Sequence, residues 1–99
     1  MNWKNQKNQR LIQALLSLKN EDEARRFLRD LMTEPEITEF GKRLKAAEML
    51  IIQTPYLKIE KETGLSSATV ARVAKWLNGS EGGYRAIINR LNHHTPIRL

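Results

Sequence analysis

The chain has 99 residues, the length of one domain, and carries 17 Lys and Arg residues against 11 Asp and Glu residues, a formal net charge of +6. This positive balance favours a polyanion such as nucleic acid as the partner. The absence of cysteine excludes disulfides and thiolate metal sites, and no run of about 18 apolar residues could span a membrane. We therefore expect a cytoplasmic protein with no signal peptide and no membrane partner.

Two short amphipathic helices are predicted near the N-terminus, over residues 9–18 and 21–32, with a break at Asn20. Residues 1–8 are polar and are expected to be frayed. The apolar faces of the two helices are formed by Leu11, Ile12, Leu15, Leu16 and Leu18, and by Ala24, Phe27, Leu28, Leu31 and Met32. We interpret these faces as the packing surface of a core or of a dimer core, because a monomer of this length is only marginally stable.

The longest predicted helix runs from Glu34 to about Gln53. Thr33 and Glu36 have the spacing of a capping box, and Pro35 lies in the first turn, where no backbone N–H is needed. Apolar residues recur along this helix at three- and four-residue steps: Ile37, Phe40, Leu44, Ala47, Leu50 and Ile51. The helix therefore has one apolar face available for packing.

The interior of this helix holds a glycine and a basic cluster. Gly41 costs about 1 kcal/mol relative to Ala inside a helix, so it indicates either a close helix crossing or no role at all. Lys42, Arg43 and Lys45 lie on or near the outer face, and the simplest interpretation of such a run is a solvated surface.

Residues 54–78 carry the pattern of a helix-turn-helix, two helices joined by a tight turn. Thr54 can cap the first helix, and Pro55 suits its first position. Gly64 can adopt the left-handed backbone at which a helix ends, and Ser66 can cap the second helix. The residues predicted to face inward are Ile59, Leu65, Val70, Val73 and Leu77, and those predicted to face outward are Ser67, Ala68, Ala71, Arg72 and Lys75. The second helix of such a unit enters the major groove of DNA.

The outer face of the second helix has the chemistry expected of a DNA-reading surface. It carries small and cationic side chains, and no acid occurs between Glu62 and Glu81. Hydroxyls and cations can contact phosphates or base edges, and alanines can pack against a thymine methyl. The candidate DNA-binding residues are Ser66, Ser67, Ala68, Thr69, Ala71, Arg72 and Lys75. Lys58 and Lys61 would contact the DNA backbone from the first helix, whereas Glu60 departs from the small residue that many such motifs have at the helix–helix contact.

A glycine-rich loop and a last helix over residues 83–92 complete an all-α chain of about six helices, treated as a single domain over residues 1–99. The tail from His93 onward is expected to be disordered. Two adjacent histidines point in different directions, so no metal site is predicted at His93 and His94. No phosphate-binding glycine loop and no catalytic constellation is found, so we expect no enzymatic activity.

Three stretches of the chain resemble the Trp repressor superfamily, and within it the YerC/YecD branch. They read LMTEPEITEFGKRLKAAEML, KETGLSSATVARVAKWLN and GGYRAIINRL, and they follow one another in the same order and at similar spacing. The resemblance runs from Leu31 to about Leu91, about 60 of the 99 residues. It implies an all-α homodimer with intertwined N-terminal helices, in which about residues 9–53 are the dimerisation helices and residues 54–78 are the helix-turn-helix.

The same resemblance implies an effector pocket formed by Arg43, Arg72, Val73 and Trp76. In the Trp repressor, tryptophan binds between the central helix and the recognition helix and sets the angle of the DNA-reading units. Arg43 matches the arginine near the ligand ring, and Arg72 matches the arginine that pairs with the ligand carboxylate. Val73 and Trp76 stand where the tryptophan-responsive protein has Gly and a small Ser, so the protein's own side chains would fill the pocket. We therefore expect no cofactor, with a tryptophan co-repressor as the alternative.

Together these features predict a sequence-specific DNA-binding transcriptional regulator that acts as a homodimer on double-stranded DNA. Two alternatives remain open. The first is a helical protein–protein interaction module without DNA binding, which salt-dependent retention on DNA would exclude. The second is a repressor gated by tryptophan or another small effector, which calorimetry with tryptophan would reveal.

Overall fold

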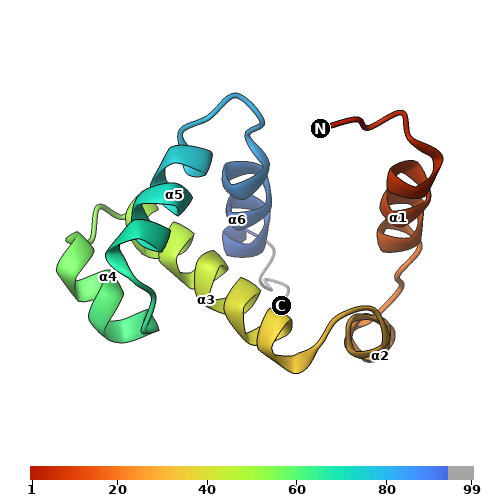
Figure 1. Cartoon of the computed structure of the whole chain (residues 1–99), viewed down its shortest axis with the longest axis horizontal. Helices are drawn as coiled ribbons and strands as arrows, with labels where there is room; N and C mark the ends of the chain where they lie inside the picture. The colour runs from red at the N-terminus through yellow and green to blue at the C-terminus, as the bar shows by residue number, and fades with distance from the viewer. Residues whose placement is uncertain (94–99) are drawn as a thin grey trace. The chain divides into compact units, whose positions relative to one another are not determined.

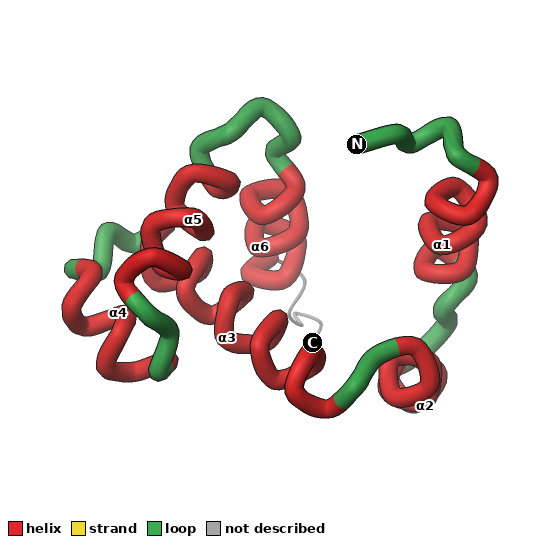
Figure 2. The backbone as a smooth tube through the Cα atoms, in the orientation of Figure 1, coloured by secondary structure: helices red, strands yellow, loops and turns green. Residues whose placement is uncertain are grey.

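The computed structural model describes residues 1–93, which form six helices and no strand (Figure 1). The helices are α1 (Gln6–Leu16), α2 (Glu21–Leu31), α3 (Glu34–Ile51), α4 (Tyr56–Thr63), α5 (Ser67–Leu77) and α6 (Gly83–His93), and Figure 2 shows the loops that join them. The predicted all-α fold of about six helices is confirmed. The disorder expected from His93 onward is wrong for His93, which ends α6, and residues 94–99 lie outside the described part of the chain. The chain divides into two compact units, residues 1–37 and residues from Thr38 onward.

The N-terminal unit contains α1 and α2, and an asparagine side chain caps each of them. Asn5 accepts hydrogen bonds from two backbone N–H groups of the first turn, at 2.8 and 3.3 Å, so α1 begins at Gln6 and not at residue 9. The prediction of a frayed segment is therefore wrong for residues 6–8. Asn20, predicted only as a break, is the N-cap of α2 and accepts from the N–H of Glu23 at 2.9 Å.

No residue of α1 or α2 is buried. The large apolar side chains that remain exposed on these helices are Leu11, Ile12, Leu15, Leu16 and Leu31. Asp22 pairs with Arg25 and Arg26 at 2.6 and 3.0 Å, but ion pairs as exposed as these stabilise a helix only weakly. The N-terminal unit therefore has helices but no core of its own.

The first turn of α3 contains the predicted capping box. The N–H of Thr33 donates to Glu36 Oε1 at 2.9 Å, and the N–H of Glu36 donates to Thr33 Oγ1 at 3.2 Å. The backbone hydrogen bond, followed by that of the Thr33 hydroxyl, lowers the pKa of the Glu36 carboxyl below its ordinary value of 4.5. Its contribution to folding is present above pH 4.5 and is lost as the pH falls through the lowered folded pKa.

The C-terminal end of α3 is closed by a Schellman motif. Gln53 has a left-handed φ of 61°, and its N–H donates to the Leu50 carbonyl at 2.9 Å. The N–H of Thr54 donates to the Met49 carbonyl, also at 2.9 Å. Thr54 thus completes the end of α3, and the prediction that it caps α4 is wrong. The N-cap position of α4 is Pro55, which makes no side-chain capping bond.

The core of the C-terminal unit is built around the helix-turn-helix. All five residues predicted to face inward are buried: Ile59, Leu65, Val70, Val73 and Leu77. All of these except Leu77 belong to one hydrophobic cluster, which also contains Ala46, Ala47 and Met49 of α3 and Ile88 of α6. The cluster therefore joins all four helices of this unit and holds α5 against α3 and α6.

The turn between α4 and α5 is stabilised by a buried threonine. Gly64 ends α4 with a left-handed φ of 77°, as predicted. The hydroxyl of Thr63 donates to the Ile59 carbonyl at 2.7 Å and accepts from the N–H of Leu65 at 3.1 Å. One side chain therefore satisfies polar backbone groups on both sides of the glycine, which fixes the path of the chain into α5.

Replacing Thr63 by Val keeps the shape of the side chain but removes the hydroxyl. The buried N–H of Leu65 then has no partner, so we expect a loss of about 1–3 kcal/mol in the free energy of unfolding, measured by urea denaturation. Thr63→Ser, which keeps the hydroxyl and removes only a methyl, is the matched control and should lose less. A Val variant as stable as the wild type would show that this hydroxyl does not stabilise the turn.

Candidate nucleic-acid interface

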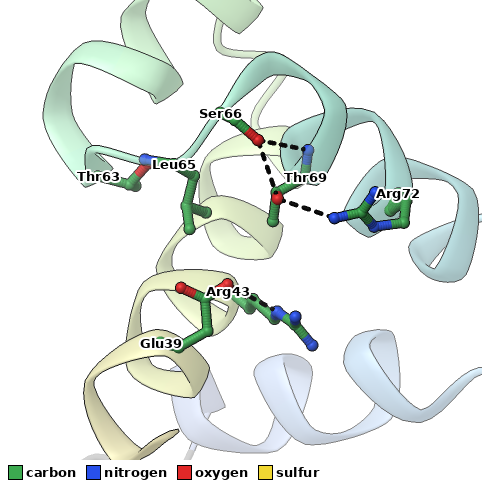
Figure 3. Close-up of polar contacts among 7 residues, drawn as sticks. All are labelled: Glu39, Arg43, Thr63, Leu65, Ser66, Thr69 and Arg72. Carbon is green, nitrogen blue, oxygen red and sulfur yellow. Dashed lines mark hydrogen bonds and ion pairs between the residues drawn. The ribbon is translucent and has the colours of Figure 1, made fainter. Parts of the chain in front are cut away.

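A chain of hydrogen bonds ties the N-terminus of α5 to its arginine (Figure 3). Ser66 Oγ accepts from the N–H of Thr69 at 3.1 Å, and the Ser66 hydroxyl donates to Thr69 Oγ1 at 3.0 Å. Arg72 Nη2 donates to the same threonine oxygen, also at 3.0 Å. The predicted cap at Ser66 is confirmed, and through Thr69 it also orients Arg72.

Thr69 differs from the other candidate DNA-binding residues in its burial. The remaining six are exposed: Ser66, Ser67, Ala68, Ala71, Arg72 and Lys75. Thr69 is only 8% exposed, and its hydroxyl oxygen already accepts two hydrogen bonds. The structure therefore makes Thr69 a support for Arg72 and not a side chain presented to a ligand, because its position on the helix turns it toward the core.

The charge of the helix-turn-helix is concentrated on α5. No acid occurs between Glu62 and Glu81, so none lies on the turn or on α5. On α4, Lys58 forms an exposed pair with Glu62 at 3.8 Å, which is weak and screened by salt. Lys61 is exposed and Glu60 is half-buried. The two glutamates of α4 therefore balance its two lysines in formal charge, while the cations of α5 have no acid on their own helix.

The glycine and the lysines of α3 have different surroundings. A methyl group at Gly41 would meet no other atom within 4 Å, so no helix of the described chain crosses α3 closely at that point. A methyl group at Gly64 would lie 3.8 Å from Nζ of Lys42, which places this ammonium beside the turn. The prediction that Lys42 is exposed is confirmed, but its position beside the turn was not predicted, because it depends on how α3 passes the turn. Lys45, two residues further on, is simply exposed.

Arg43 is enclosed by residues from α3 and α5. Its guanidinium carbon lies 5.4 Å from the centroid of the Phe40 ring and 5.6 Å from the centroid of the Trp76 ring, both within cation–π range. Its Nε donates to Glu39 Oε2 at 3.2 Å, as Figure 3 shows. The interpretation of the whole basic cluster as solvated surface is therefore wrong for Arg43.

The four residues of the predicted effector pocket lie in different surroundings. Val73 is buried in the core, and Arg72 bonds Thr69 on the exposed side of α5. Trp76 borders a cavity of about 430 Å³, lined by Leu44, Trp76, Glu81, Gly83, Tyr84 and Ile87. The two arginines and Val73 do not line that cavity. Burial raises the pKa of Tyr84 above its ordinary value of 10.0, against the opposing charge of Arg43, so its hydroxyl is protonated at neutral pH.

A polar link joins the C-terminal end of α5 to α6. Asn78 Nδ2 donates to the Ala74 carbonyl at 3.0 Å, which also accepts from the backbone N–H of Asn78 at 3.1 Å. Arg85 Nη2 donates to Asn78 Oδ1 at 2.8 Å. The C-terminal end of α5 is thus held by α6 through one asparagine side chain.

Residues 1–93 contain no group of three or more His, Asp or Glu that could hold a metal ion. His93 Nδ1 lies 2.8 Å from the Asn89 carbonyl, and His94 is outside the described residues. None of the helices in this part of the chain combines the length and the apolarity needed to cross a bilayer.

Comparison with known proteins identifies the family. The model of the Trp repressor protein family matches residues 6–92. The chain is 42% identical over 81 residues to the uncharacterized protein YerC of Bacillus subtilis (strain 168), an alignment that covers 82% of this chain and 78% of YerC. The match to the family model thus includes both the N-terminal helices and the helix-turn-helix.

Two crystal structures have the same fold over nearly the whole chain. A TrpR-like protein from Eubacterium eligens ATCC 27750 superposes with a TM-score of 0.86 at 39% identity, covering 95% of this chain and 97% of that protein. A candidate Trp repressor from Staphylococcus aureus superposes with a TM-score of 0.85 at 33% identity, covering 97% and 99%. The chain therefore belongs to the Trp repressor family, as a YerC-type member of a family that is regulatory and not enzymatic.

Proposed function

We propose that this protein is a sequence-specific DNA-binding transcriptional regulator, which acts as a homodimer and reads the major groove with α5. The observation that carries the proposal is the exposed face of α5. This face begins at the N-cap residue Ser66 and bears small and cationic side chains with no acid among them. Such a face can approach a phosphate backbone without electrostatic repulsion. Membership of the Trp repressor family supports the same function.

Each exposed side chain of α5 has a role that its chemistry permits. One N–H group of the Arg72 guanidinium donates to Thr69 Oγ1, and its other N–H groups can donate to a guanine edge or a phosphate. Ala68 and Ala71 are short enough to let the helix approach the bases, and their methyl groups can pack against a thymine methyl. Ser67 and Lys75 flank this surface and contact phosphates, which sets the register of the helix on the duplex.

A second copy of this chain is the partner that we propose for the N-terminal unit. No residue of α1 or α2 is buried, so their apolar faces need a cover if the unit is to be stable. A two-fold dimer covers the same face on both copies. The two α5 helices would then enter successive major grooves, which predicts a roughly palindromic site with half-sites about one helical turn apart.

Selection from a pool of random duplexes, followed by sequencing, tests the proposal as a whole. We expect a roughly palindromic motif to be enriched, and the affinity for it to fall linearly with salt on logarithmic axes, because phosphate neutralisation releases counterions. A dimer that shows no salt-dependent retention on DNA even at low ionic strength would overturn the proposal. That result would favour a helical protein–protein interaction module.

Replacing Arg72 by Ala should weaken binding to the selected duplex by roughly 1–3 kcal/mol and relax the preference at one base position. Circular dichroism should show unchanged helicity, because Arg72 is exposed. Lys75→Ala is the matched control on the same helix: we expect it to weaken binding to all duplexes alike and to reduce the salt slope by about one. Unchanged binding by the Arg72 variant would remove this residue from the reading surface.

Replacing Leu15 by Glu places a charge on the apolar face of α1 and should dissociate the dimer, as measured by sedimentation equilibrium. Gln6→Glu adds the same charge on the opposite side of this helix, half a turn away in projection, and should leave the dimer intact. The dimer proposal fails if the wild-type chain is a monomer throughout the micromolar range, or if both variants associate as it does.

A further inference from the structure

The arginine stack, formed by Phe40, Arg43 and Trp76, links α3 to the last turn of α5. Phe40 and Arg43 belong to α3 and lie one turn apart, and the Trp76 ring comes from α5. The guanidinium thus lies over both aromatic rings, while Glu39 accepts from its Nε. This cation is held by three partners, one of which is on the recognition helix.

Arg43 is poorly placed to serve as a direct contact to DNA. Its side chain is only 28% exposed, and its charge is paired with the Glu39 carboxylate at 3.2 Å. The neighbouring Lys42 and Lys45 are both exposed and carry the same charge. An arginine that contacted phosphates would be expected to extend into solvent as these lysines do, so its enclosure indicates a different role.

The stack acts at the C-terminal end of α5, where Leu77 is also buried. The N-terminal end is set by the cap at Ser66 and by the buried Val70 and Val73. The C-terminal end has the stack at Trp76 and the hydrogen bond from Arg85 to Asn78. A small displacement of this end would tilt the exposed face of α5, so contacts to base edges would suffer before contacts to phosphates.

We propose that the arginine stack holds the recognition helix in its DNA-reading orientation without a bound small molecule. Arg43 and Trp76 are then positioning residues, which act on the bases only through the tilt of α5. The inference rests on the proposed DNA-binding function. The indole ring of Trp76 then provides the contact that fixes α5 against α3. DNA binding therefore requires no small-molecule effector.

The test compares Arg43→Gln, Trp76→Ala and Trp76→Phe with the control Lys45→Gln, which removes one charge from the same helix two residues away. Each is titrated against the selected duplex and a scrambled duplex over a range of salt. For Arg43→Gln and Trp76→Ala we expect a roughly 5- to 30-fold loss on the selected duplex, with little change on the scrambled duplex and an unchanged salt slope. Trp76→Phe restores most of the loss, because its ring still accepts the cation.

Two further measurements separate positioning from other roles. The double variant Arg43→Gln/Trp76→Ala should bind no more weakly than the weaker single variant, because both disrupt one contact. Added tryptophan should change neither the affinity of the wild type for DNA nor its melting temperature. Lys45→Gln, if it has any effect, should weaken binding to both duplexes alike.

Fluorescence of Trp76 reports on the stack in the absence of DNA. The chain has two tryptophans, so Trp3→Phe leaves Trp76 as the single emitter. In that background, Arg43→Gln should increase quenching of Trp76 by acrylamide, and Lys45→Gln should not.

Four results would overturn the inference. Arg43→Gln could lower affinity for both duplexes equally and reduce the salt slope by about one, which would make Arg43 a phosphate contact. It could lower the melting temperature and leave affinity for the selected duplex unchanged, which would make the stack purely structural. Tryptophan could strengthen DNA binding by the wild type. An intact stack by fluorescence in a protein that fails to bind DNA at all would overturn the proposed function itself.

Discussion

The hydrophobic cluster that buries one side of α5 is the contact on which the rest of the C-terminal unit depends. Val70 and Val73 are fully buried, and so are Ala46 and Ala47 in the same cluster. Because Ala46 and Ala47 are fully buried, a larger side chain at either position would have to displace the cluster. Because only one side of α5 takes part in this packing, its opposite side remains available to a ligand.

The two ends of α5 are secured by different chemistry. Hydroxyl groups hold the N-terminal end, where Ser66 and Thr69 share hydrogen bonds. An amide and an aromatic ring, Asn78 and Trp76, hold the other end through partners on α6 and α3. A helix restrained in this way loses little conformational freedom when it binds, which favours affinity and a single binding geometry.

The features that depend on residues close together in the chain were the most predictable. The capping box at Thr33, the left-handed glycine at position 64 and the cap at Ser66 each need only a few neighbouring residues, and all are present. The start of α1 was misplaced because the apolar stripe begins well after Asn5. The burial of Thr69 and the enclosure of Arg43 depend on contacts between helices, and no local pattern reports those. The side chains that touch DNA remain a prediction.

The corner between α3 and α4 has a consequence for how the chain tolerates changes in length. Gln53 and Thr54 close α3 by fixed backbone hydrogen bonds, and Pro55 follows directly as the entry to α4. Inserting or deleting a single residue here would disrupt one of these two hydrogen bonds or separate Pro55 from the end of α3, and α4 would leave α3 in another direction. The length of this corner therefore helps to set where Ile59 enters the core, and with it the course of the chain into α5.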